Sequence, residues 1–98
     1  MIERIKCNEK KLDKIVFAVR ELEKALNNFE EVSEDIKELN EYYGSKEWFE
    51  DKEAYECNKI EKIKAGVLSE DAVWNLNEEI RELKYLIEDT ILVINNNL

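Results

Sequence analysis

The chain of 98 residues contains no histidine, no proline and only two glycines. Histidine is the usual acid–base group at neutral pH, and it is also part of the Glu-x-x-His motifs that hold paired iron ions in helical bundles. Two isolated glycines cannot form a phosphate-binding loop. These absences disfavour an enzyme, and we expect no catalytic residues, no metal site and no cofactor.

Cysteines and long apolar runs are equally scarce. Cys7 and Cys57 are fifty residues apart, without a Cys-x-x-Cys spacing and without an apolar leader ahead of them. This pattern does not indicate a secreted disulfide framework, so we expect a reduced, cytoplasmic setting. The longest apolar run, Ile91 to Ile94, is far shorter than the roughly 20 residues that span a bilayer. We therefore expect no membrane segment.

Acidic residues outnumber basic ones, 24 to 15, for a net charge of −9. Because Lys and Arg contacts to phosphate supply most nucleic-acid affinity, this charge argues against nucleic acid as a partner. Residues 1–26 carry seven basic and five acidic groups, whereas residues 27–56 carry three basic and eleven acidic ones. The basic end of one chain could therefore lie near the acidic middle of a second chain, as antiparallel dimerisation would place them.

Apolar residues between positions 5 and 43 alternate at spacings of three and four, which is typical of an amphipathic helix. One row contains Ile5, Leu12, Val19 and Leu26, and the other contains Ile15, Leu22, Phe29, Ile36 and Tyr43. Asn8 interrupts the second row, and Ser33 and Asn40 interrupt the first. A third row, formed by Ala18, Ala25, Val32 and Leu39, predicts a helix that meets more than one neighbour. We predict one helix over about residues 3–43.

Gly44 should end this helix, because glycine adopts the left-handed conformation of a C-terminal cap without steric cost. Ser45 then occupies the position of an N-cap, followed by Glu47 in the first turn. We predict a short second helix over about residues 46–57, with Lys52 interrupting its apolar face. A linker over about residues 58–68 follows, and either a helical or an extended conformation fits residues 58–65.

The last helix has the clearest start in the chain. Ser69 is placed to cap it, Glu70 and Asp71 lie in the first turn, and Leu68 and Val73 hold the two positions of a hydrophobic staple. Apolar residues then recur at spacings of three and four. We predict a helix over about residues 70–95, fraying at the three asparagines that follow residue 94.

Together these elements predict one all-α domain over residues 1–98, a long antiparallel hairpin with the short helix over the bend. The first helix exceeds the last by roughly 14 residues, or about 20 Å, so its N-terminal turns would lack a partner within the chain. Two helices also make a thin core. We therefore expect a homodimer that completes a four-helix arrangement.

Three blocks around the bend resemble a known family. They are Tyr42-Tyr43-Gly44-Ser45, Trp48-Phe49-Glu50-Asp51 and Gly66-Val67-Leu68-Ser69-Glu70-Asp71-Ala72-Val73. In order and spacing they resemble the signature of a bacterial domain-of-unknown-function family, number 4298. The resemblance implies a cytoplasmic, all-helical bacterial protein without an assigned activity. Family members often have an apolar residue where Lys52 stands and a proline near Ile60, and this chain has neither.

Large aromatic and acidic side chains gather at the same bend. The candidate contact surface consists of Tyr42, Tyr43, Trp48, Phe49, Glu50, Asp51, Tyr55 and Trp74. Aromatic residues are favoured interface anchors, but the rings could equally form the core under the bend. We interpret the protein as a non-enzymatic interaction or scaffold module with an unidentified protein partner. The alternative is a small-molecule-binding or regulatory protein that uses the aromatic corner as a pocket.

Overall fold

The computed structural model describes residues 1–98, all in helices, turns and irregular segments, with no strand. The contacts divide the chain into two units, residues 1–38 and residues 39–98. The all-α prediction is confirmed, whereas the single domain, the hairpin and the homodimer stay predictions.

The first unit consists of α1 (Ile2–Glu31) and the start of α2 (Ser33–Tyr42). The predicted long helix over about residues 3–43 is helical along almost its whole length but is bent at Val32, which separates α1 from α2. The backbone N–H of Val32 bonds to the carbonyl oxygen of Phe29 at 3.1 Å, three residues back instead of four. Val32 has φ −98° and ψ 5°, and α2 then begins with Glu34 and Asp35 in its first turn. Those carboxylates favour a new helix start because they lie at the positive end of its dipole.

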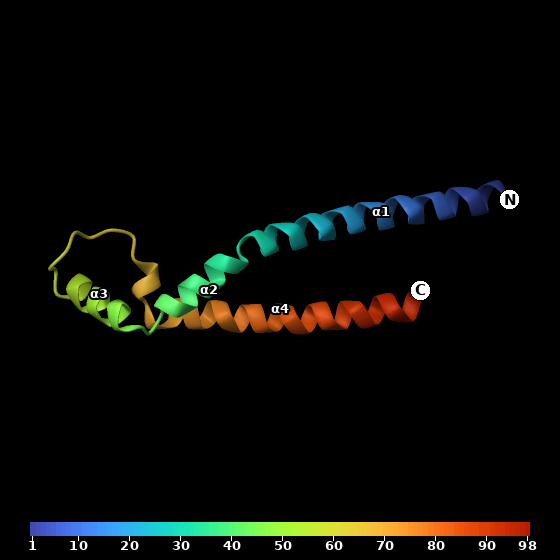
Figure 1. The fold of residues 1–98 in the computed structure, drawn as a ribbon. Helices are drawn as coiled ribbons and strands as arrows, with labels where there is room; N and C mark the ends of the chain where they lie inside the picture. Colours follow the sequence, from blue (N-terminus) through green and yellow to red (C-terminus); the bar gives the residue numbers. More distant parts are fainter. The chain divides into compact units, whose positions relative to one another are not determined.

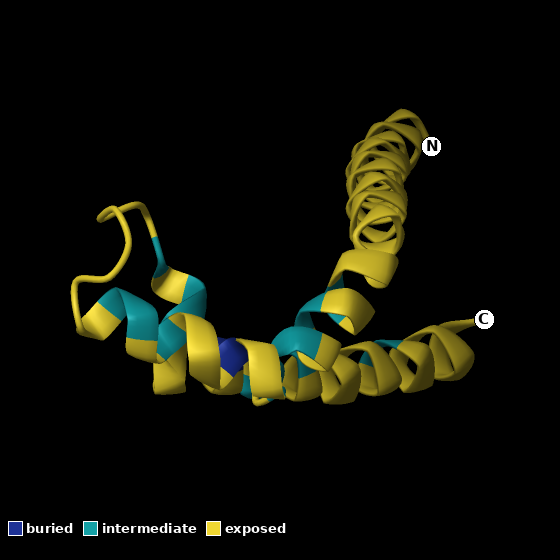
Figure 2. Ribbon diagram, turned by 60° about the vertical axis from the view of Figure 1, so that its left-hand side comes forward, coloured by how far each residue is buried: buried dark blue, intermediate teal, exposed yellow.

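The first unit has no core of its own. No residue of α1 is buried, and Figure 2 shows the whole of this helix in the colour of exposed residues. A helix with an apolar stripe normally obtains most of its stability by burying that stripe. The stripe of α1 therefore lacks the contact that its sequence predicts.

The second unit begins where α2 ends, at a sharp turn. Gly44 has φ +79°, the left-handed conformation predicted for it. The Ser45 hydroxyl then accepts a hydrogen bond from the Trp48 backbone N–H at 3.2 Å, which confirms Ser45 as the N-cap of α3 (Lys46–Glu56). These two residues place α3 directly after the end of α2.

The end of α3 was not predicted in this form. Asn58 has φ 57°, and the backbone N–H groups of Asn58 and Lys59 bond to the carbonyl oxygens of Tyr55 and Ala54 at 3.3 and 2.9 Å. This pair of bonds is a Schellman motif, in which asparagine occupies the position that glycine usually takes. An irregular segment follows, and Figure 1 shows how it arches from α3 back to the 3₁₀-helix η1 (Gly66–Leu68). The predicted linker over residues 58–68 thus includes a short helix.

The last helix, α4 (Glu70–Asn97), starts at Ser69 as predicted. The Ser69 hydroxyl accepts from the Asp71 backbone N–H at 3.3 Å. The helix extends two residues beyond the predicted end, and the side-chain amide of Asn97 donates to the Val93 carbonyl oxygen at 2.7 Å. The asparagines that were expected to fray the helix therefore belong to its last turn.

Candidate functional site

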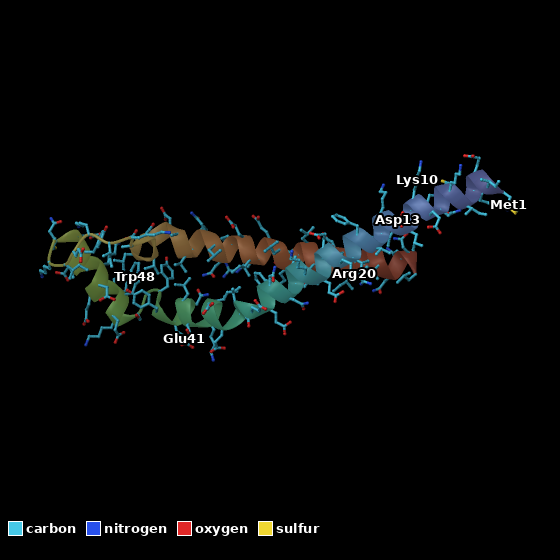
Figure 3. The ribbon with its side chains drawn as sticks, turned by 90° about the horizontal axis from the view of Figure 1, so that it is seen from above. Met1, Lys10, Asp13, Arg20, Glu41 and Trp48 are labelled. Carbon is cyan, nitrogen blue, oxygen red and sulfur yellow. The ribbon has the colours of Figure 1, made fainter.

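Trp48 is the centre of the corner formed by α3, η1 and the start of α4. Only 3% of its surface is exposed, and Val73 is the one other residue buried to this degree. Its indole Nε1 donates a hydrogen bond to the Val67 carbonyl oxygen at 2.9 Å, which ties α3 to η1. In Figure 3 the labelled Trp48 lies on the side of α3 that faces the chain leading into α4. Trp48, a candidate contact residue, therefore lies in the core of this corner and not on its surface.

Two other rings pack edge-on against Trp48. The ring centroids of Tyr43 and Phe49 lie 5.2 and 4.9 Å from that of Trp48, with interplanar angles of 77° and 82°. Such edge-to-face pairs are favourable because the positive edge of one ring meets the negative face of another. The Tyr43 hydroxyl donates to the Glu70 carbonyl oxygen at 2.6 Å. Tyr43 therefore joins the end of α2 to the first turn of α4.

Tyr42, the neighbour of Tyr43, bonds to a carboxylate instead. Its hydroxyl donates to Asp51 Oδ2 at 2.7 Å. The hydrogen bond to Asp51, partial burial and the negative charge of Asp51 together raise the pKa of Tyr42 to about 12. Asp51 therefore acts here as the acceptor that fixes Tyr42 against α3.

Lys52 is an integral part of the corner although its charge interrupts the apolar face of α3. Its Nζ lies 2.7 Å from Glu70 Oε1 and 3.9 Å from Glu56 Oε1, and 5.3 Å from the centroid of the Trp48 ring. The hydrogen bond and charge of Glu70 raise the pKa of Lys52, and Lys52 in turn lowers the pKa of Glu70. The ammonium group thus lies over the indole ring and also pairs with Glu70 at the start of α4, which explains how a charged residue fits where an apolar one was expected.

The irregular segment after α3 is held by Tyr55. Its hydroxyl donates to the Ile63 carbonyl oxygen at 3.0 Å. Lys62 Nζ lies 4.1 Å from the centroid of the Tyr55 ring and donates to the Tyr55 carbonyl oxygen. The conformation that the sequence left open is thus an irregular loop closed over a tyrosine.

The remaining candidate residues lie on the surface. Phe49 is 59% exposed although one edge touches Trp48, and Trp74 is 56% exposed on α4. Glu50 is exposed and its carboxylate lies 3.9 Å from Lys46 Nζ. Of the eight candidate residues, the structure therefore brings the rings of Tyr43, Trp48 and Phe49 together and, separately, joins Tyr42 to Asp51.

A polar contact that the sequence analysis did not predict joins the last turns of α2 to α4. The Asn40 side-chain amide donates to Asn77 Oδ1 at 3.2 Å, and the Asn77 amide donates to Asn40 Oδ1 at 2.7 Å. Asn40 was recognised only as an interruption of an apolar row. Asn40 on its interrupted row was the available signal, because an asparagine at such a position can pair with another on a neighbouring helix and fix the register of the two helices.

Large apolar surfaces lie on the long helices, away from the corner. The two main rows of α1 are exposed from 42% at Phe29 to 60% at Ile15, and Phe17 on another face of this helix is 68% exposed. The last turns of α4 are apolar on more than one side. Tyr85, Leu86, Leu92 and Val93 lie away from the row of Leu83, Ile87 and Ile94 and are each 59% to 61% exposed. A helix that is apolar all round is normally surrounded by other helices.

Residues 5–89 match the family described as "Domain of unknown function (DUF4298)". The chain belongs to this family. The resemblance seen in three blocks of the sequence is thus confirmed over most of the chain's length, although the description of the DUF4298 family assigns no activity. No curated protein and no solved structure matches the chain.

The cysteines and carboxylates of the chain are dispersed over the structure. Nowhere does it bring together three or more His, Cys, Asp or Glu side chains that could hold a metal ion. Cys7 and Cys57 are both exposed free thiols. None of the helices is long and apolar enough to cross a membrane. What this DUF4298 chain displays is a small, internally bonded corner and two long helices with uncovered apolar faces.

Proposed function

We propose that this chain is a non-enzymatic interaction or scaffold module that acts by packing its long helices against other helices. The observation that supports this most is the exposure of every apolar row of α1. Monomeric proteins rarely leave so long an apolar surface in contact with water. The surface is also rimmed by charged residues, as interaction surfaces usually are.

The arrangement we propose is the antiparallel hairpin, completed to four helices by a second copy of the chain. The Asn40–Asn77 pair supports it, because it joins the last turn of α2 to α4 near the start of α4. The end of α4, which is apolar on more than one side, would then contribute an apolar surface to this four-helix arrangement. A cytoplasmic location would keep Cys7 and Cys57 reduced.

Light scattering coupled to size exclusion tests the proposal. We expect the mass of a dimer at micromolar concentration and a Tm that rises with protein concentration, because association stabilises the folded state by mass action. A monomer whose Tm does not depend on concentration would argue against self-association. If the chain is a monomer but binds one other protein in a stoichiometric complex, the homodimer is excluded and the proposed interaction function is supported.

The aromatic corner is the proposed contact surface for a further protein partner, through Phe49, Trp74 and Glu50. The small-molecule alternative stays a prediction. Against it, the polar atoms of Trp48, Tyr42 and Tyr43 already bond within the chain. A metabolite panel that raises the Tm would favour the alternative, and the variant Phe49→Ala would show whether the corner is responsible.

A further inference from the structure

Residues 1–38 form a unit that consists mostly of α1, and no residue in the apolar rows of α1 is buried. An amphipathic helix normally packs such rows against another helix. The rows include Leu12, Ile15, Val19, Leu22 and Phe29, which are 53%, 60%, 46%, 47% and 42% exposed. They follow a heptad, the pattern by which two helices pack knobs into holes. The distribution of charge along the unit indicates which helix packs against these rows and in which direction.

The two ends of this unit have opposite charge. Residues 1–14 carry five basic and three acidic side chains, whereas residues 27–38 carry one basic and five acidic side chains. The middle, residues 15–26, carries two of each and is neutral. A parallel pair would place like charges together at both ends, whereas an antiparallel pair places each basic end against an acidic end.

We propose that the partner of residues 1–38 is the same segment of a second copy, antiparallel, with a two-fold axis between Arg20 and Glu21. This rests on the proposed self-association and specifies its interface. In this register Leu12 faces Phe29 of the second copy, Ile15 faces Leu26, and Val19 faces Leu22. Each of these three pairs joins a residue of the row that contains Leu12 to a residue of the row that contains Ile15, as antiparallel packing requires.

The polar interruptions of the rows select this register. Asn8 interrupts one row and Ser33 the other, and here they face each other. The Asn8 amide donates to the Arg4 carbonyl oxygen at 2.9 Å, so its Oδ1 can accept from the Ser33 hydroxyl of the second copy. A shift of one heptad would instead set Asn8 against Leu26, or Ser33 against Ile15. Each shift leaves a polar group facing an apolar one, which is unfavourable in a buried seam.

The residues beside the apolar rows favour this register near the two-fold axis, whereas one pair of like charges disfavours it. Ala18 comes beside Ala25 of the second copy on one edge of the seam, and these small side chains permit close approach of the helices. On the other edge Glu9 comes near Glu30 of the second copy, where like charges repel. The register therefore also predicts that Glu30→Lys tightens the dimer at low salt, while Lys24→Glu, on the outer face, does not.

Cross-linking of the full chain tests the register. In a background with Cys7→Ser and Cys57→Ser, the variants Leu12→Cys and Phe29→Cys are mixed in denaturant, refolded together and treated with a short bis-maleimide. We expect a covalent dimer from the mixture and none from either variant alone. Positions 12 and 29 are about 25 Å apart along a helix, so one antiparallel dimer cannot join two identical positions.

The controls distinguish the possible failures. The mixture of Ile5→Cys and Phe29→Cys should give no cross-link, and a cross-link there would show the register shifted by one heptad. A covalent dimer from Leu12→Cys alone would show parallel packing and overturn the proposal. Light scattering is measured on every variant: dimers that never cross-link in the mixture would disprove this register and leave self-association intact, whereas a monomeric unmodified chain would disprove both.

Discussion

At the residue scale, the Trp48 side chain makes both the ring contacts and the hydrogen bond that hold the corner together. Its ring is the packing surface for Tyr43 and Phe49, and its indole N–H binds the Val67 carbonyl oxygen, which lies nineteen residues further along the chain. With only Val73 buried to the same extent, the corner has few other contacts that could replace it. Its loss should therefore unfold the corner instead of exposing a binding site.

We expect Trp48→Ala to lower the free energy of unfolding by about 3 kcal/mol or more, because it leaves a large cavity and an unbonded carbonyl oxygen. Trp48→Phe keeps a ring and should cost less, about 1–2 kcal/mol. Urea denaturation followed by circular dichroism measures both. Trp74→Phe is the matched control, since this tryptophan is exposed, and it should change stability little. Equal stability of the Trp48→Ala variant and the original chain would contradict the assigned core role.

The bond between Tyr42 and Asp51 predicts a pH dependence. The folded-state pKa of Tyr42, about 12, lies above the ordinary value, which is about 10 for tyrosine. The stabilisation from this bond is thus fully present below about pH 10 and is lost as the pH rises through about 12. Titration of tyrosinate absorbance should show one late step that disappears in Tyr42→Phe. In Asp51→Asn the step should move to lower pH, and an unmoved step would argue against the bond.

At the element scale, the helix boundaries follow local chemistry and the breaks between them are harder to predict. Gly44, Ser45 and Ser69 were predicted correctly because each acts on its own neighbouring backbone. The break at Val32 was missed because the heptad rows continue across it, although Ser33 on an interrupted row was a visible signal. The contacts of Trp48 with Val67, and of Asn40 with Asn77, join residues far apart in sequence, and no local pattern specifies them.

The two glycines provide a matched test of the turn after α2. Gly44 has φ +79° and open space around it, so Gly44→Ala should cost about 1 kcal/mol from backbone strain alone. Gly66 also has open space but no positive φ. Gly66→Ala should therefore be neutral or stabilise by up to about 1 kcal/mol. Thermal denaturation of both variants measures the difference, and equal effects would indicate that the turn adopts another conformation in solution.

At the scale of the whole molecule, the proposed association should depend on apolar packing more than on charge. Ile15→Asp puts a carboxylate into the proposed seam, where burial of a charge is costly. We expect its dimer Kd to rise tenfold or more, which corresponds to at least about 1.4 kcal/mol. Lys10→Asp, on the outer face of the same helix, should weaken the dimer less, and high salt should reduce its effect. Light scattering across a dilution series measures both, and a dimer unaffected by Ile15→Asp would place the interface elsewhere.

The uncovered state of α1 has a consequence for the protein inside a cell. A helix that buries nothing gains little from tertiary packing, and a solitary helix in water is only marginally stable. If association supplies the missing stability, newly made chains at low abundance remain partly unwound over their first thirty residues and open to proteases, whereas abundant chains protect one another. The lifetime of the protein would then depend on its own concentration, and it would lengthen once that concentration exceeds about the dissociation constant of the dimer.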